Sequence, residues 1–265
     1  MLAEPLLAAL SLRLVPRVLL GISGAPGSGK STLAQALVAA AQRHGVAALA
    51  LSLDDFYHGR AERLRLARAV HPLLATRGVP GTHDLDLLLA TLDALNAASP
   101  RRPAPVPRFD KGRDTRHPPS RWRRITRSPQ LLVLEGWCLG LPAQPAQALR
   151  RPLNALERNE DADGHWRCWV NARLAEYARR LWPCLNPLLL LQAPGWTAVC
   201  RWRDEAERPL RRAAAPRALD RTALRRFLQH YERLTRHALN CLPARADWLI
   251  VLDGQRRVHA VRRRR

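Results

Sequence analysis

The feature that most constrains this chain is a glycine-rich loop near its N-terminus, which reads GAPGSGKS from Gly24 to Ser31. It matches the pattern G-x-x-x-x-G-K-[ST], in which glycines let backbone N–H groups turn toward a phosphate. The loop follows an apolar run, residues 17–23, and precedes an alanine-rich stretch with helical periodicity, residues 30–43. Strand, loop and helix in this order predict a phosphate-binding loop, with a chance glycine cluster as the alternative.

We expect this loop to bind ATP together with Mg²⁺. In such loops the lysine reaches the β and γ phosphates, the following hydroxyl binds Mg²⁺, and the helix N-terminus adds its positive dipole end. Lys30 is therefore also a candidate catalytic residue, and Ser31 a candidate metal ligand. The expected nucleotide-binding residues are Gly24, Ala25, Gly27, Ser28, Gly29, Lys30, Ser31 and Thr32.

Further apolar runs predict a sheet around the strand that leads into the loop. Residues 46–53, 131–135, 188–192 and 248–253 read as buried strands, and helical patterns separate them. Continuous apolar strands that alternate with helices are typical of a parallel sheet covered on both faces. We predict an α/β fold of the P-loop NTPase type, a three-layer sandwich with a mostly parallel central sheet. No uncharged apolar run reaches the length of a membrane span.

The chain is expected to form one domain with short additions at both ends. Residues 1–15 are an N-terminal segment, residues 16–255 the domain that carries the loop, and residues 256–265 a basic tail. We expect its last four arginines, 262–265, to be solvated, with anion binding as the alternative. Residues 100–129 are too rich in proline for a helix, and long loops in compact domains tend to be functional. Residues 201–217 are dense in arginine, and we expect them to form a lid over the site.

The charge balance raises a second class of partner. Forty-four basic residues against 22 acidic ones give a formal net charge of +22, which is typical of nucleic-acid-binding proteins. However, the arginines are scattered along the chain, and Lys30 and Lys111 are its only lysines. We therefore expect neither a nucleic-acid partner nor a membrane. The five cysteines form no CxxC pair, and the first residues lack a basic leader, so a cytoplasmic location fits best. The oligomeric state is left open.

Acidic residues follow two of the predicted strands. Asp54 and Asp55 come directly after the strand at 46–53, which we expect to neighbour the strand before the loop, and Glu135 ends the next strand. Phosphoryl transfer needs positioning and charge neutralisation. We expect one of the two aspartates to accept the proton of the acceptor hydroxyl, and Asp54, Glu135 and Ser31 to bind Mg²⁺. The alternative for the aspartates is a helix cap or a turn.

Arginines after the fourth strand are candidates for closing over the phosphates as charge develops. Arg201 and Arg203 are assigned catalytic roles on this basis. For any single arginine of this stretch, a solvated helix face is the alternative. The stretch contains Arg201, Arg203, Arg208, Arg211 and Arg212.

Taken together, the motifs resemble those of the D-glycerate 3-kinases, within the wider group of uridine kinases, phosphoribulokinases and pantothenate kinases. The resemblance covers most of the chain, and the segments after the loop narrow it to the glycerate kinase-like branch. The matching stretches are GISGAPGSGKSTL at 21–33, SLDDFY at 52–57, RGVPGTHD at 77–84, PRFDK at 107–111, LEGWCLG at 134–140, NALE at 154–157, DADGHW at 161–166, RWRDE at 201–205, HYERLTRH at 230–237 and ARADWLIVLD at 244–253.

The resemblance implies transfer of the γ-phosphate of ATP to a hydroxyl of D-glycerate, giving 3-phosphoglycerate, with Asp54 as the base. Within the matched stretches, arginines can bind a carboxylate by a bidentate fork and lysine as a point charge. The candidate substrate-binding residues are Asp55, Tyr57, Arg77, His83, Asp84, Arg108 and Lys111. The chain departs from the family pattern at Thr115, where an acidic residue is usual, and this bears on the choice of acceptor.

Two other functions remain as alternatives. The first is a kinase of the same fold that acts on another hydroxyl compound, such as a nucleoside or pantothenate. The second is an ATP-dependent nucleic-acid-binding or regulatory protein, which the net charge would favour.

Overall fold

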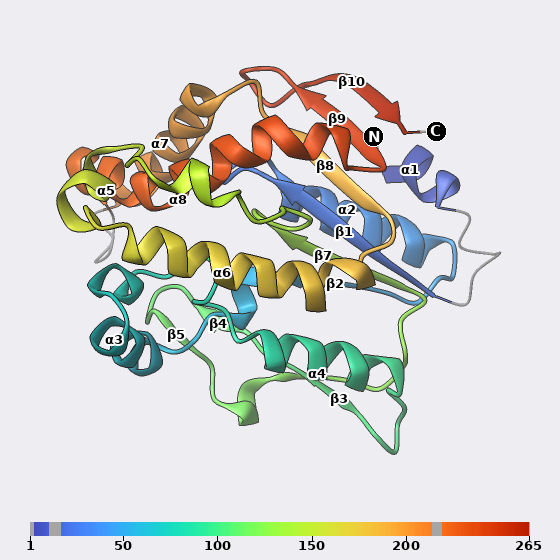
Figure 1. Ribbon diagram of the computed structural model, residues 1–265. Coiled ribbons are helices and arrows are strands. Elements are labelled where there is room, and N and C mark those ends of the chain that lie inside the picture. Colours follow the sequence, from blue (N-terminus) through green and yellow to red (C-terminus); the bar gives the residue numbers. More distant parts are fainter. Residues whose placement is uncertain (1–2, 11–16, 214–218, 265) are drawn as a thin grey trace.

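The computed structural model describes residues 3–10, 17–213 and 219–264. Its centre is a six-stranded sheet in the order β10-β9-β8-β1-β7-β2 (Figure 1). Five strands run parallel, and β10 is antiparallel to β9. The strands are β1 (Val18–Gly24), β2 (Ala48–Ser52), β7 (Leu131–Gly136), β8 (Leu188–Gln192), β9 (Trp248–Leu252) and β10 (Val258–Arg263).

Helices cover both faces of this sheet, which confirms the three-layer prediction. One face packs on α1 (Ala3–Ala9), α2 (Lys30–Arg43) and α7 (Trp196–Arg212), and their buried residues form one apolar cluster with the sheet. The opposite face packs on α4 (Leu85–Asn96), α6 (His165–Arg180) and α8 (Arg221–Cys241). Two shorter helices are α3 (Arg60–Ala69) and α5 (Ala155–Glu160).

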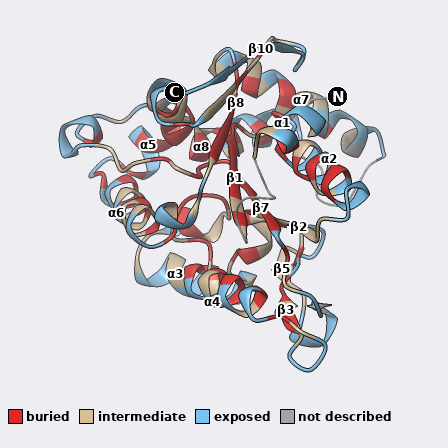
Figure 2. Cartoon of the chain, turned by 90° about the vertical axis from the view of Figure 1, so that its right-hand side faces the viewer, coloured by how far each residue is buried: buried red, intermediate tan, exposed pale blue. Residues whose placement is uncertain are grey.

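The strand residues explain why both faces need a cover. In β7, Leu131 and Val133 belong to one apolar cluster, whereas Leu132 and Leu134 belong to the other. All four are almost fully buried, and Figure 2 shows the central strands as the most buried part of the chain. Because side chains alternate across a strand, a run that is apolar at every position requires two packing layers.

The strand order differs from our expectation at one place. We expected β2 to neighbour β1, but β7 lies between them and pairs with both. The short turn after β2, residues Leu53–Phe56, lies over the end of β7 instead. A Cβ on Gly136 would lie 2.9 Å from the Cβ of Leu53, so glycine permits this close packing. This turn therefore places Asp54 closer to the end of β1.

The proline- and arginine-rich segment forms two small two-stranded antiparallel sheets, of which the second is a hairpin. Strands β3 (Ala104–Val106) and β6 (Arg123–Ile125) make the first, and β4 (Phe109–Asp110) and β5 (Thr115–Arg116) make the second. The β4–β5 hairpin is fastened to the turn after β2, because the Phe109 N–H donates to Asp55 over 3.0 Å.

The two ends of the chain contribute to the fold. Within the basic tail, residues 258–263 form β10 at the edge of the sheet and are mostly exposed; the valines of this strand favour an extended backbone. Within the N-terminal segment, α1 packs against α2, and Glu4 lies 3.0 Å from His44. Residues 1–2 and 11–15 of that segment, residues 214–217 of the expected lid, and Arg265 lie outside the described residues.

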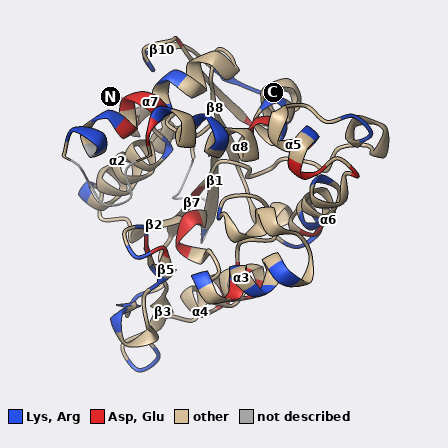
Figure 3. Cartoon of the chain, turned by 90° about the vertical axis from the view of Figure 1, so that its left-hand side faces the viewer, with Lys and Arg blue, Asp and Glu red and all other residues tan. Residues whose placement is uncertain are grey.

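The arginines are less scattered in space than along the chain. Figure 3 shows basic residues gathered on the part of the molecule that carries β3. Six exposed arginines belong to this region, and none forms an ion pair with a described acidic residue: Arg101, Arg102, Arg121, Arg123, Arg124 and Arg127. Among the described helices, none combines the length and the apolar character needed to cross a membrane.

Candidate active site

The glycine-rich loop lies at the carboxyl end of β1 and leads into α2. Gly27 and Gly29 have φ angles of 82° and 93°, in the left-handed region that favours glycine. A Cβ on Gly27 would lie 3.1 Å from the Cβ of Trp202, so α7 packs closely against the loop. The Lys30 ammonium donates to the Ala25 carbonyl over 3.1 Å, which folds the lysine back along the loop.

A cavity of about 310 Å³ opens beside this loop. Its walls come from segments that are far apart in the sequence but meet at the carboxyl ends of the parallel strands, where ligands of open α/β sheets bind. The lining residues are Pro26, Gly27, Lys30, Ser31, Asp54, Tyr57, Arg77, Lys111, Glu135, Trp137, Arg203, Phe227, Leu228 and Tyr231.

The three residues that we expected to bind Mg²⁺, Ser31, Asp54 and Glu135, all line this cavity. The Ser31 hydroxyl donates to Glu135 Oε1 over 2.9 Å, and Asp54 lines the same cavity. Carboxylate and hydroxyl oxygens suit Mg²⁺, which is bound through one or two carboxylates together with substrate phosphates and water. Burial lowers the pKa of Lys30, whereas Glu135 and Asp54 beside it oppose that shift.

Asp54 forms an ion pair across the cavity with the second lysine of the chain. Lys111, on the turn of the β4–β5 hairpin, donates to Asp54 Oδ2 over 2.8 Å. Burial opposes the ionisation of Asp54, but the Lys111 ammonium outweighs it, and the pKa of Asp54 lies below its usual value. Asp54 is therefore a carboxylate at neutral pH.

Of the candidate substrate-binding residues, Tyr57, Arg77 and Lys111 line the cavity, and two others support it from behind. His83 is buried and stacks on Tyr57, with 4.4 Å between the ring centroids. Burial lowers the pKa of His83 to about 3, so its ring is neutral. Asp55 accepts the N–H of Phe109, and burial raises the pKa of its carboxyl group.

Two further candidates do not line the cavity. Asp84 caps the N-terminus of α4 by accepting the Leu87 N–H over 3.0 Å, and it pairs with Arg116 at 3.1 Å. Arg108 is exposed on the surface. Asp84 therefore has the capping position that we gave as the alternative for other aspartates.

The two arginines assigned to catalysis point in different directions. Arg203 lines the cavity and lies 3.6 Å from Glu207 on the same helix. Arg201 instead donates to the carbonyl of Gly254, away from the cavity. Residues two apart on a helix differ by about 200° in direction, which explains the difference.

A second hollow, of about 990 Å³, lies on the other side of the loop. Ser28, Gly29 and Thr32 border it, together with apolar residues that include Leu33 and Val258. Of the expected nucleotide-binding residues, Gly27, Lys30 and Ser31 line the cavity and Ser28, Gly29 and Thr32 border this hollow, whereas Gly24 and Ala25 line neither.

Several lining residues were not among the predicted site residues. Trp137 and Tyr231 pack edge to face with 4.9 Å between ring centroids, and Phe227 lies 5.0 Å from Tyr231. Phe227 and Tyr231 are four residues apart on α8, a spacing typical of core residues, so the sequence pattern alone does not mark them as part of a site. Trp137 could have been found from its position two residues after Glu135. Asp114, which binds Arg77 from outside the cavity, gave no signal of its own.

No protein-family model matches the chain. Over 221 residues it is 33% identical to the uncharacterised kinase mug58 of Schizosaccharomyces pombe, a match that covers 80% of this chain and 78% of that protein. It is also 32% identical over 209 residues to the chloroplastic D-glycerate 3-kinase of Arabidopsis thaliana, covering 74% of this chain and 42% of that one. The chain belongs to the glycerate kinase-like P-loop kinases. It is therefore a phosphotransferase that acts on a hydroxyl group, and the family implies ATP as co-substrate.

Two solved structures share the fold of this chain. The D-glycerate 3-kinase of Cryptococcus neoformans var. grubii superimposes with a TM-score of 0.76 at 20% identity, covering 94% of this chain and 90% of that one. The YGR205w protein superimposes with a TM-score of 0.70 at 24% identity and the same coverage. These likenesses confirm the predicted P-loop kinase fold.

Proposed function

We propose that this glycerate kinase-like protein phosphorylates D-glycerate to 3-phosphoglycerate. The observation that carries the proposal is the composition of the cavity. It combines Lys30 of the glycine-rich loop and the Asp54 carboxylate with three further cations, Arg77, Lys111 and Arg203, in about 310 Å³. A space of this size that has cations beyond those on the loop fits a small acceptor with its own carboxylate.

The acceptor carboxylate would bind between Arg77 and Lys111. A guanidinium offers two parallel N–H donors to a carboxylate, and an ammonium adds a point charge. On binding, the Lys111 ammonium would either leave Asp54 and contact the acceptor carboxylate, or contact both carboxylates at once. Tyr57 and the aromatic wall of Trp137 and Tyr231 would limit the length of the acceptor.

In the transfer step, an oxygen of the acceptor hydroxyl bonds to the γ-phosphorus of ATP. The bond from that phosphorus to the β–γ bridging oxygen breaks, and ADP leaves with the electron pair. Asp54, which is ionised at neutral pH, takes the hydroxyl proton. Lys30 and Arg203 would stabilise the charge on the phosphoryl oxygens.

Ser31, Glu135 and Asp54 would hold the Mg²⁺ ion, which neutralises phosphate charge when it is bound. The nucleoside of ATP would lie in the second hollow beside Gly29 and Thr32, whose apolar residues suit a flat base. The triphosphate would then cross the glycine-rich loop toward the cavity.

An acceptor panel tests this proposal. Purified protein with ATP and Mg²⁺ should release ADP with D-glycerate, and much less with L-lactate, which has a methyl group in place of the terminal hydroxymethyl group. A nucleoside and pantothenate complete the panel, and faster turnover with either would replace D-glycerate by that acceptor. Lys30→Ala should abolish turnover, whereas the control Arg65→Ala, on exposed α3, should not. An active Lys30→Ala variant would contradict the role of the loop.

The expected absence of a nucleic-acid partner also remains a proposal. The exposed arginines around β3 and β6 are the surface on which such a function would rest. ATP hydrolysis without a small acceptor, together with salt-sensitive binding of a labelled oligonucleotide, would favour that function instead.

A further inference from the structure

We infer that Asp114, which lies outside the cavity, is a positioning residue that orients the Arg77 guanidinium toward the acceptor carboxylate. This inference rests on the proposed function, because it assigns to Arg77 the role of binding the acceptor.

Asp114 lies on the turn of the β4–β5 hairpin. Its φ angle is 57°, a left-handed conformation that aspartate adopts more readily than most residues. The carboxylate lies between two guanidinium groups: Oδ2 is 2.7 Å from Arg63 Nη2, and Oδ1 accepts from Arg77 Nη1. With 19% of its side chain exposed, Asp114 is largely screened from water by these partners.

Arg63 cannot reach a ligand, because its donors are used inside the protein. Its side chain is only 1% exposed. Besides Asp114, it donates to the carbonyls of His58 over 3.2 Å and Ala75 over 3.0 Å. Arg63 therefore ties the hairpin to α3 and to the segment before Arg77, and it leaves the cavity side to Arg77.

Three contacts hold Arg77 in position, and part of its guanidinium group faces the cavity. Its guanidinium carbon lies 5.5 Å from the centroid of the Phe109 ring, and its carbonyl accepts from the Tyr231 hydroxyl over 3.0 Å. Its Nη1 atom contacts Asp114. Among the described residues, no protein group accepts a hydrogen bond from its Nε or Nη2 atoms, while the side chain lines the cavity.

The charges of Arg63, Arg77 and Asp114 also indicate that Arg77 is the group that meets the acceptor. One carboxylate between two guanidinium groups leaves the cluster with one positive charge, and only Arg77 presents it to the cavity. Without the Asp114 charge, the two arginines repel each other and Arg77 gains rotamer freedom. Ordering one such side chain again on binding corresponds to about a 3- to 10-fold loss of affinity for the acceptor.

The experiment is a kinetic double-mutant cycle on Asp114 and Arg77 in the full-length enzyme. Asp114→Asn should raise the KM for D-glycerate about 3- to 10-fold, with the KM for ATP changed less than about 2-fold. In an Arg77→Met background, Asp114→Asn should cause no further increase, because its effect passes through Arg77.

The matched control is Asp110→Asn on the same hairpin. Asp110 accepts the Arg113 N–H over 2.9 Å and does not contact Arg77. This variant removes the same charge from the same element, and it should leave the KM for D-glycerate unchanged. Asp114→Glu keeps the charge between the guanidinium groups, and it should raise this KM less than Asp114→Asn does.

Two results would overturn the inference. One is an equal rise in both KM values, and the other is the same effect of Asp114→Asn with and without Arg77. Either would make Asp114 a structural residue only. If Asp114→Asn does not fold, the comparison of both KM values in Asp114→Glu decides. Turnover of D-glycerate by the parent enzyme is measured first, so failure of the proposed function shows there; the cycle then uses the acceptor that the panel identifies.

Discussion

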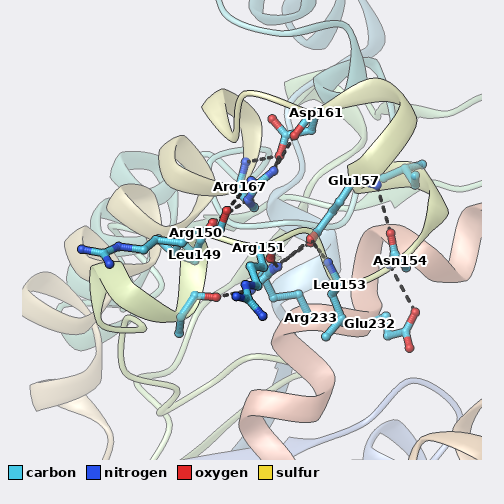
Figure 4. A network of polar contacts seen from close by, with 12 residues as sticks. Leu149, Arg150, Arg151, Leu153, Asn154, Glu157, Asp161, Arg167, Glu232 and Arg233 are labelled. Carbon is cyan, nitrogen blue, oxygen red and sulfur yellow. Dashed lines mark hydrogen bonds and ion pairs between the residues drawn. The ribbon is translucent and has the colours of Figure 1, made fainter.

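Replacing Arg233 by methionine should strongly destabilise this protein, because Arg233 is the partner of a buried carboxylate. Figure 4 shows Arg233 of α8 reaching Glu157 of α5, whose side chain is 0% exposed. Two contacts join them, from Arg233 Nε to Glu157 Oε1 at 2.7 Å and from Nη2 to Oε2 at 2.6 Å. Arg233 also donates to the carbonyls of Ala148 and Arg151, each over 2.8 Å.

The size of the destabilisation follows from the polar groups that lose their partner when methionine replaces Arg233. Glu157 would keep only neutral donors such as the Leu153 N–H at 2.7 Å, and two carbonyl groups would lose their partner. Removing one member of a buried ion pair costs about 3–5 kcal/mol. For a chain of this size, roughly 2–4 °C per kcal/mol translates this into a thermal midpoint lower by about 6–20 °C.

Thermal and urea unfolding of three variants measure this effect. Arg236→Met is the matched control on the same helix. The Arg236 side chain is 48% exposed, and its partner Glu232 keeps the Asn154 amide as a donor, so this change should alter stability by less than about 1 kcal/mol. Replacing Arg233 and Glu157 together by methionine and leucine should recover most of the loss, since apolar pairs often replace buried ion pairs without cost. If Arg233→Met unfolds at the same urea concentration as Arg236→Met, the reasoning is refuted.

Three further predictions concern the site and its surroundings. Glu135→Gln keeps an oxygen for Ser31 but removes a charge from the metal site, so kcat should fall at least about 100-fold; a kcat near that of the parent would exclude this role. Lys111→Met should raise the KM for D-glycerate about 10- to 100-fold, the worth of a charge-assisted hydrogen bond, and an unchanged KM would exclude carboxylate binding by Lys111. Burial lowers the pKa of His83 to about 3 and that of His230 to about 4, whereas unfolded histidine titrates near about 6.5. Because the unfolded chain binds these protons more readily than the folded one, the free energy of unfolding is unaffected by the two histidines above pH ~6.5. Below that pH it falls, by up to about 1.4 kcal/mol per pH unit for each histidine. Urea unfolding of His83→Gln between pH 6.5 and 4.5 should show a shallower decline, and an unchanged slope would contradict the neutral buried ring.

The layers of the fold could be predicted from the sequence because they depend on local patterns. The apolar runs at 131–134 and 188–191 lack polar positions, and such runs need cover on both faces. The strand order could not be predicted in the same way. The insertion of β7 between β1 and β2 is decided by pairing between segments more than 80 residues apart, and no local pattern specifies it.

The site divides in the same manner. Asp54 and Glu135 were predictable because the carboxyl ends of parallel strands meet at one edge of a sheet. The choice between Arg201 and Arg203 depended on how α7 is rotated about its axis, which Trp202 fixes by packing against Gly27. Asp114 acts through contacts with two arginines of other segments, and a turn residue carries no local mark of such a role.

The phosphate half and the acceptor half of the site are built in different ways. The phosphate half is one continuous motif from β1 into α2, so its geometry follows from local backbone preferences. The acceptor half joins the β4–β5 hairpin, the segment at Gly78 and α8, and these interlock: a Cβ on Gly78 would lie 2.1 Å from the Tyr231 hydroxyl. A change in the hairpin can therefore alter how Arg77 is held without disturbing Lys30. Differences at Thr115, beside Asp114, should accordingly change the choice of acceptor more than the use of ATP.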